Sequence, residues 1–228
     1  MTPLADTANV PAFAEHLAVL PDFLPPEHFT ALAREVEGLG CTERSYVPTH
    51  KQGGTIAFDT LRARAPGVVG FYRSAELRDR LGSVIGATLK VTPEGDYSSC
   101  SILVYERPGD HIGWHYDHNF YRGRHFTVLL PVVNRNAAGS GLSSGRLFAK
   151  IGGVERLVPT PPNQLVVFEG AKVLHRATPI DEGERRVVLS MTFGTDPRIS
   201  VPFELARRVK DMAFFGLRAL WGGQRRGA

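Results

Sequence analysis

Residues 185–193 read RRVVLSMTF, an alternating apolar run that predicts a β-strand. Four further runs rich in β-branched and aromatic residues lie upstream, at 101–105, 126–133, 147–151 and 164–168. Clusters of Gly, Pro, Asn and Asp separate these runs, and many short strands at such spacing predict a β-sandwich or barrel. The expected fold is therefore mainly β.

The first third of the chain predicts α-helices that flank this β core. A short amphipathic stretch covers 12–20, and the proline pair at 25–26 can form the first turn of a helix that runs to about Gly38. Ser74 is a candidate N-cap for a further helix that ends before Gly86.

No linker or internal repeat divides the 228 residues, which predicts a single domain. We expect 1–88 to form a mainly helical support, 89–195 the β core and 196–228 a helical tail. Within the support, 46–70 is expected to be loop and irregular strand. The tail mixes basic and aromatic residues, and we favour its docking on the domain over its lying at a membrane surface.

The composition is that of a globular chain rich in turns. Hydrophobic residues make up 43% and charged residues 22%, which excludes a disordered chain. A formal net charge of +4 is too small to argue for a nucleic-acid partner. The start has no basic region followed by an apolar one, and no stretch is long and apolar enough to span a membrane, so we expect a cytoplasmic protein.

The stretch GWHYDHN, residues 113–119, carries the candidate metal site. Cys41 and Cys100 show no CxxC spacing, so a metal has to be held by His and carboxylate side chains. On an extended segment His115 and Asp117 share one face, roughly 6.6 Å apart at Cα, and both can bind one ion.

A third ligand has to come from another strand. His175 follows the apolar run QLVVFEG at 164–170 and is the candidate. Two imidazoles and one carboxylate form the facial triad typical of non-haem Fe(II) oxygenases, and zinc is the competing metal.

The segment EGERRVVLSMTF, residues 182–193, offers a cation for an anionic cosubstrate. If iron holds the keto-acid end of 2-oxoglutarate, the distal carboxylate needs a fixed cation, and an arginine suits best. Alternation places Arg186 on the mixed face of the strand and Arg185 on the apolar face, which also carries Val187, Leu189, Met191 and Phe193. We therefore expect Arg185 to point into the core and bind the anion.

Three motifs in sequence order resemble the Fe(II)/2-oxoglutarate-dependent dioxygenases, in particular the prolyl-4-hydroxylase-like branch. They are LPDFLPPEHFTALAREV (20–36), YERPGDHIGWHYD (105–117) and HRATPIDEGER (175–185). The resemblance covers about 20–193. It implies a double-stranded β-helix, also called a jelly roll or cupin-like fold, with flanking helices.

The resemblance also implies roles for single residues. The implied iron ligands are His115, Asp117 and His175, and Arg185 would bind the C5 carboxylate of 2-oxoglutarate. Tyr105 would hydrogen-bond the cosubstrate, and Thr127 falls where the branch has a Thr in the cosubstrate pocket. The sequence departs from the branch at Pro131, where relatives commonly carry a Tyr that helps to hold the cosubstrate.

By this resemblance we expect a dioxygenase that hydroxylates an unactivated C–H bond of a small-molecule or peptidyl, amino-acid-like substrate. Fe(II), 2-oxoglutarate and O2 are implied, with ascorbate as an optional reductant and succinate and CO2 as co-products. Two alternatives stay open, a non-catalytic jelly-roll binding protein and a nucleic-acid demethylase that uses the same iron chemistry. Met191 stands where the demethylase branch has a second Arg, which disfavours that alternative. No motif sets the oligomeric state.

Other segments and residues near the motifs have simpler expected roles. The Gly- and Ser-rich loop 134–145 and the segment 46–70 are predicted to flank the mouth of the pocket and to be ordered by substrate, with a plain solvent-exposed connection as the alternative for the loop. Lys51 could meet an anionic substrate, but a solvated surface charge is favoured, and Tyr116 is expected to pack away from the metal. Solvent-facing or supporting roles are expected for His111, His118 and His125.

Overall fold

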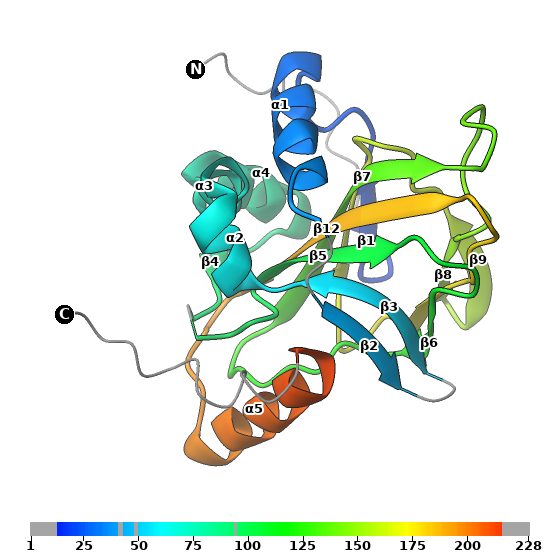
Figure 1. The fold of residues 1–228 in the computed structure, drawn as a ribbon. Coiled ribbons are helices and arrows are strands. Elements are labelled where there is room, and N and C mark those ends of the chain that lie inside the picture. Colours follow the sequence, from blue (N-terminus) through cyan, green and yellow to red (C-terminus); the bar gives the residue numbers. More distant parts are fainter. Residues whose placement is uncertain (1–12, 41–42, 48–49, 94, 216–228) are drawn as a thin grey trace.

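One antiparallel sheet dominates the part of the chain that the computed structural model describes, residues 13–40, 43–47, 50–93 and 95–215. Ten of its twelve strands follow the order β1-β10-β7-β12-β5-β3-β6-β11-β8-β9, while β2 pairs with β3 and β4 with β12. The sheet curls on itself, and four helices lie together on one side of it (Figure 1). The prediction of a mainly β, jelly-roll-like fold with flanking helices is confirmed.

The strands are β1 (Leu17–Leu20), β2 (Glu43–Val47), β3 (Lys51–Ile56), β4 (Lys90–Val91), β5 (Cys100–Tyr105), β6 (His111–His115), β7 (His125–Arg135), β8 (Leu147–Ile151), β9 (Val154–Val158), β10 (Leu165–Glu169), β11 (His175–Ala177) and β12 (Arg185–Gly194). All five predicted strands appear among them, within one or two residues of the expected bounds.

The helices are α1 (Pro26–Glu37), α2 (Phe58–Arg64), α3 (Pro66–Arg73), α4 (Ala75–Ile85) and α5 (Val201–Phe215). The helices predicted to begin at the proline pair 25–26 and at Ser74 are confirmed as α1 and α4. The Ser74 hydroxyl accepts a hydrogen bond from the backbone N–H of Leu77 at 3.1 Å, and Gly86 ends α4 in the left-handed conformation at φ 71°.

The two faces of β12 have different surroundings. Its outer face packs against α1, α3 and α4 in the main hydrophobic cluster and carries Val187, Leu189, Met191 and Phe193. Its inner face lines a cavity inside the curl and carries Arg186, Val188, Ser190 and Thr192. The apolar face of this strand therefore points to the helices, and the mixed face points to the cavity.

Strand β10 is buried on both faces, which explains its continuous apolar sequence. Leu165 and Val167 join the main cluster under the helices, whereas Val166 and Phe168 join a second cluster inside the curl. The second cluster also contains side chains of β7, β8, β9 and β12. It therefore packs the β7, β10 and β12 side of the curled sheet against the β8 and β9 side.

Two local predictions in the first third are wrong. The stretch 12–20 contains a tight turn in which Glu15 and His16 both have positive φ, and this turn leads into β1 rather than a helix. The segment 46–70 contains the end of β2, all of β3 and α2, and the first part of α3, so the predicted strand is present but the two helices were not expected. Its helices are too short for their apolar residues to show a clear helical period.

No residue of the loop 134–145 lines the cavity, although a Cβ on Gly145 would lie 3.3 Å from Cδ of Arg186, and this placement favours the plain connection over a lid. Asn134 Oδ1 accepts hydrogen bonds from the backbone N–H and the hydroxyl of Ser143, at 3.1 and 2.7 Å. The Ser144 hydroxyl bonds to the Glu184 carboxylate. The loop follows β7 at the end of the strand opposite to the metal ligands, and its residues are absent from the described cavity wall.

The predicted tail helix is confirmed over Val201–Phe215 as α5, and the rest of the tail lies outside the described residues. Arg207 is buried against the body, whereas four large apolar side chains of this helix are exposed. Within the described part, no helix is long and apolar enough to cross a bilayer. Cys100 is a buried free thiol, and Cys41 lies outside the described residues.

Candidate active site

The three predicted metal ligands meet at one point. His115 ends β6 and is paired in the sheet with His175, the first residue of β11, while Asp117 follows β6 by two residues. Oδ1 of Asp117 lies 3.5 Å from Nε2 of His115, and its Oδ2 lies 4.0 Å from Nε2 of His175. One donor atom from each residue lies within 4.8 Å of the other two, which is close enough to hold one metal ion.

Backbone carbonyls orient both imidazole rings. Nδ1 of His115 lies 2.8 Å from the carbonyl oxygen of Gly113, and Nδ1 of His175 lies 3.1 Å from that of Val173. A carbonyl oxygen only accepts, so each Nδ1 carries the proton and each Nε2 presents a lone pair. The same contact fixes the tautomer of metal-binding histidines in general.

Two neighbours position the Asp117 carboxylate. The hydroxyl of Thr127, on β7, donates a hydrogen bond to Oδ2 at 2.5 Å. The backbone N–H of Asp117 donates to the carbonyl of Gly170 at 3.0 Å. A Cβ on Gly170 would lie 2.7 Å from Cβ of Asp117, so only glycine lets the two segments approach this closely.

The surroundings favour the deprotonated forms of two of the three ligands, Asp117 and His175, whereas Asp117 raises the pKa of His115. Burial raises the pKa of Asp117, but His175, His115 and the Thr127 hydroxyl outweigh it, and the pKa falls well below its usual range. Burial lowers the pKa of His175 to about 4. At neutral pH the site therefore presents a carboxylate together with an uncharged His175 imidazole.

The triad lines a cavity of about 310 Å³ enclosed by the curled sheet. Side chains of β3, β5, β7 and β12 form one wall, and those of β6, β8 and β11 form the other. Two cations lie in this wall, Lys51 of β3 with 3% of its surface exposed and Arg186 of β12 with 2%. Nε of Arg186 has no hydrogen-bond partner among the described residues, and a buried cation is costly unless an anion pairs with it, so this arginine suits the cavity to an anion.

The cavity arginine is Arg186, and the prediction that Arg185 points inward is wrong. Arg185 is only half-buried and lies outside the described cavity wall. The alternation in 185–193 grouped the residues correctly, but the wholly apolar face packs under the helices. The cavity inside the curl holds the metal ligands as well as apolar side chains, so the mixed face with Arg186 is the one that belongs there.

Comparisons with known proteins rest on structure alone, since no family model and no curated protein matches the sequence. A prolyl-4-hydroxylase from Pseudomonas putida is 21% identical, with 79% of this chain and 93% of that chain covered and a TM-score of 0.57. A 2OG-Fe(II) oxygenase family oxidoreductase from Burkholderia pseudomallei is 14% identical, with 80% and 89% covered and a TM-score of 0.58. The epimerase SnoN, solved with Fe3+, alpha ketoglutarate and nogalamycin RO, is 12% identical, with 78% of each chain covered and a TM-score of 0.61. The chain has the fold of the 2OG-Fe(II) oxygenases.

Within this oxygenase fold, Tyr105 lies beside Arg186. The two residues are paired across β5 and β12, and Cζ of Arg186 lies 5.1 Å from the centre of the Tyr105 ring. Burial raises the pKa of Tyr105, although Arg186 opposes the shift, so the phenol keeps its proton and can donate it in a hydrogen bond. Pro131 is paired with Val188 and lies outside the described cavity wall.

Lys51 lines the cavity, whereas the sequence favoured a solvated surface position for it over contact with an anionic substrate. Its ammonium group donates to the Thr55 hydroxyl at 3.0 Å, and Gly53 lies between these residues on the same face of β3. A Cβ on Gly53 would lie 3.8 Å from the Tyr105 ring. No local pattern marks a lysine in an irregular segment as buried, so its expected surface position is wrong.

Asp110 is a second residue that the sequence analysis missed, and it shapes the turn between β5 and β6. Its carboxylate accepts hydrogen bonds from the backbone N–H groups of Glu106 and Arg107, each at 3.0 Å, and from the Arg44 guanidinium at 2.5 and 3.2 Å. This turn joins the strand of Tyr105 to the strand of His115. The sequence signal that could have found it is the Pro-Gly-Asp turn at 108–110.

Other side chains near the ligands also face the cavity. Both His118 and His125 line it, and Tyr116 does so instead of packing away from the metal. His111 is half-buried and lies outside the described lining. His50 reaches the metal ligands from the start of β3, and its ring centre lies 5.6 Å from that of His115.

Proposed function

We propose that the chain is an Fe(II)- and 2-oxoglutarate-dependent oxygenase that hydroxylates an unactivated C–H bond of a small-molecule or amino-acid-like substrate. The observation that carries this proposal is the meeting of His115, Asp117 and His175 in a buried cavity that also holds Arg186. When bound, Fe(II) and 2-oxoglutarate supply the oxidation by O2, with succinate and CO2 as co-products.

The protein side chains supply binding and orientation. Two imidazoles and one carboxylate bind Fe(II) and leave coordination positions open. Gly113 and Val173 fix the imidazole tautomers through their carbonyl oxygens, and Thr127 holds the carboxylate in place. The donor set therefore fits an Fe(II) ion.

The two buried cations suit a dicarboxylate. Arg186 offers a guanidinium for the distal carboxylate of 2-oxoglutarate, and Tyr105 beside it offers a hydroxyl donor. Lys51 adds a second positive charge to the cavity wall, which offsets the cost of burying a doubly charged anion. Apolar side chains such as Leu103, Leu129 and Val188 fill the wall between the polar groups and exclude water.

The test compares two adjacent arginines. Under anaerobic conditions with Fe(II), we expect calorimetry to show 2-oxoglutarate binding to the wild type, and 2-oxoglutarate labelled at C1 to release CO2 slowly when air is admitted. Arg186→Ala should weaken 2-oxoglutarate binding about 100-fold, because a buried charge-assisted hydrogen bond contributes about 2–3 kcal/mol. Arg185→Ala is the matched control and should bind nearly as the wild type does.

Two results would contradict the proposal. One is a wild-type protein that binds neither Fe(II) nor 2-oxoglutarate. The other is an equal loss of affinity in both arginine variants, which would remove Arg186 from the cosubstrate site. A panel of metabolites and short peptides, scored by stimulated succinate formation, then identifies the substrate class.

A further inference from the structure

The cavity extends well beyond the arginine that we assign to 2-oxoglutarate. Arg186 and Thr192 of β12 both line it, six residues apart, which is about 20 Å of extended chain. Thr192 is paired with Thr127 of β7, and the Thr127 hydroxyl binds the metal ligand Asp117. A cosubstrate that reaches from Arg186 to the metal therefore leaves the Thr192 end of the cavity for the substrate.

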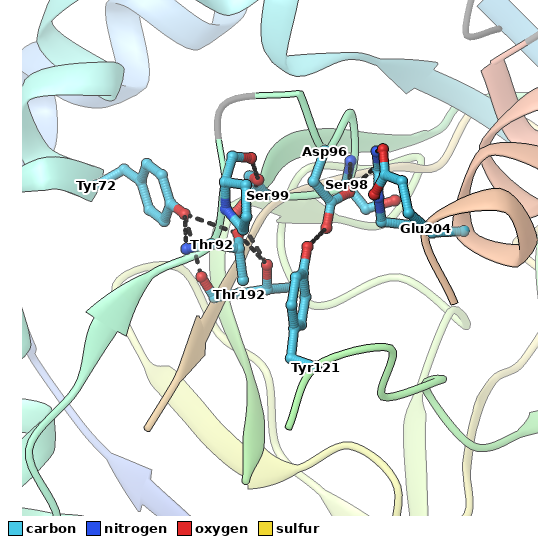
Figure 2. A network of polar contacts seen from close by, with 10 residues as sticks. Tyr72, Thr92, Asp96, Ser98, Ser99, Tyr121, Thr192 and Glu204 are labelled. Atoms are coloured by element: carbon cyan, nitrogen blue, oxygen red, sulfur yellow. Dashed lines mark hydrogen bonds and ion pairs between the residues drawn. The ribbon is translucent and has the colours of Figure 1, made fainter. Parts of the chain in front are cut away.

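A buried carboxylate, Asp96, lines this end of the cavity and exposes 4% of its surface. Its loop is tied to β12, because the backbone N–H of Thr192 donates to the carbonyl of Ser99 at 2.8 Å. The backbone N–H of Ser98 donates to Oδ1 of Asp96 at 2.9 Å, and the Tyr121 hydroxyl donates to Oδ2 at 2.5 Å, as Figure 2 shows. A carboxylate accepts about four hydrogen bonds, so a further donor can bind to a carboxylate that is already held in place.

The arginine beside Asp96 is shared with a second carboxylate. Arg207 of α5 donates two hydrogen bonds to Glu204, from Nε at 3.0 Å and from Nη2 at 2.7 Å. Its Nη1 lies 3.6 Å from Oδ1 of Asp96, which is beyond hydrogen-bond distance. One guanidinium therefore faces two carboxylates, and a buried carboxylate is costly unless its charge is compensated. A cation that enters the cavity beside Asp96 would add a second positive charge to this group.

Two serine hydroxyls lie next to this end of the cavity. Ser101 of β5 and Ser190 of β12 are paired in the sheet, and both line the cavity. Ser101 exposes only 5% of its surface, and neither hydroxyl has a hydrogen-bond partner among the residues that the structure describes. A buried hydroxyl without a partner costs free energy, so these two groups are suited to a polar ligand.

We propose that Asp96, with Ser101 and Ser190, binds a protonated amine, so that the substrate is a small molecule that carries this group. The assignment rests on the proposed oxygenase activity and names the substrate class of the same cavity. An ammonium group only donates hydrogen bonds, and the carboxylate and the two hydroxyl oxygens accept them. An anionic group at this end would be repelled by Asp96, and a neutral alcohol would leave the carboxylate charge uncompensated.

The first test uses the wild-type protein with Fe(II), 2-oxoglutarate and air. The probes are free amino acids, alkyl amines and cyclic amines, each paired with its N-acetyl derivative, which keeps the carbon skeleton and loses the charge. We expect the compounds that stimulate succinate formation to be free amines, with at least tenfold less stimulation by the acetylated partner, since a hydrogen bond to a charged group is lost.

The second test removes the acceptors. Asp96→Asn keeps the shape of the side chain and removes its charge, so KM for a stimulating amine should rise about 10- to 100-fold. Ser101→Ala should raise KM about 2- to 10-fold, as expected for an uncharged hydrogen bond. Asp79→Asn, an exposed carboxyl on α4, is the matched control and should leave KM unchanged. Calorimetric binding of 2-oxoglutarate with Fe(II) under nitrogen shows that each variant is folded, and it separates a failure of amine binding from a failure of the proposed catalysis.

Either of two outcomes overturns the proposal. One is a wild type that binds 2-oxoglutarate but is stimulated by amines no more than by their acetylated partners, whether strongly or not at all. The other is an unchanged KM for the amine in Asp96→Asn. If Asp96→Asn fails to bind 2-oxoglutarate because it is misfolded, an unchanged KM in Ser101→Ala has the same consequence.

Discussion

Gly170 makes the metal site sensitive to the addition of one methyl group. A Cβ at this position would lie 2.7 Å from Cβ of Asp117 and 3.1 Å from the Thr127 hydroxyl, so Asp117 has to move. We expect Gly170→Ala to lower Fe(II) affinity about 10- to 100-fold, as loss of the groups that orient a ligand commonly does. Anaerobic titration with Fe(II) measures this.

Gly70→Ala is the control for that substitution. Gly70 lies on α3 with open space around its missing Cβ, so alanine there should leave metal binding unchanged and stabilise the helix slightly. Wild-type Fe(II) affinity in Gly170→Ala would mean that Asp117 tolerates the displacement.

At this scale the sequence predicted residue types better than residue positions. His115, Asp117 and His175 could be chosen because few other side chains bind iron at such spacing. The choice between Arg185 and Arg186 could not be made, since alternation separates the two faces of a strand without saying which face meets the cavity. Thr127 was predicted in the pocket, and its hydrogen bond to Asp117 became visible only with the fold.

The turn between β5 and β6 depends on the charge of Asp110. Burial raises the pKa of this carboxyl, but hydrogen bonds from Arg44 and from two backbone amides outweigh it and lower the pKa below its ordinary value of 3.8. A lowered pKa means that the stabilisation is complete above pH 3.8 and is lost as the pH falls through the folded-state value. We expect Asp110→Asn to cost about 2 kcal/mol at pH 7, because Arg44 loses its charged partner, and to cost less with each step below pH 3.8.

Urea unfolding of the wild type and of Asp110→Asn at a series of pH values measures the difference in their free energies of unfolding. Asp79→Asn, an exposed carboxyl on α4, is the control and should stay within about 0.5 kcal/mol of the wild type throughout. A loss of unfolding free energy in Asp110→Asn, relative to the wild type, that grows as the pH falls would contradict the lowered pKa of Asp110.

Helices and strands whose ends are marked by capping or turn residues could be predicted from the sequence. Those that owe their conformation to contacts with distant parts of the chain could not. Ser74 and Gly86 delimit α4 through hydrogen bonding and a positive φ, both of which are properties of the residues themselves. The strand β1 has only four residues and owes its conformation to pairing with β10. The helices α2 and α3 were hidden for a similar reason, since their buried side chains form part of a core that includes α1 and β12.

The whole molecule should become more stable when both ligands bind, because the cavity joins the two halves of the sheet. Ligands that bind only the folded chain add about 2.7 kcal/mol at a concentration 100 times Kd. We therefore expect the melting temperature to rise with Fe(II) and 2-oxoglutarate together under nitrogen. The part of the rise that is due to 2-oxoglutarate should vanish in Arg186→Ala and persist in Arg185→Ala. Equal rises in both variants would show that the anion binds elsewhere.

The overall architecture was predicted on two grounds that agree with each other. Short apolar runs between turn residues indicated a barrel or sandwich, and the order of three motifs indicated a jelly roll. What the sequence could not give is the side of the sheet that the helices cover. That side is set by the packing of α1, α3 and α4 against β12, which joins residues more than 100 positions apart.

The two-sided surroundings of β12 divide the effects of substitutions along it. Polar replacements at 187, 189, 191 and 193 disturb the packing under the helices, so they should reduce the amount of folded protein in a cell. Replacements at 186 and 190 change the cavity wall, so they should leave abundance close to normal while altering turnover or the choice of substrate. Val188 faces the cavity but also belongs to the second hydrophobic cluster, so a polar residue there should lower both abundance and turnover. A library that samples every position of this strand would thus yield two interleaved profiles with a period of two residues, one for abundance and one for catalysis.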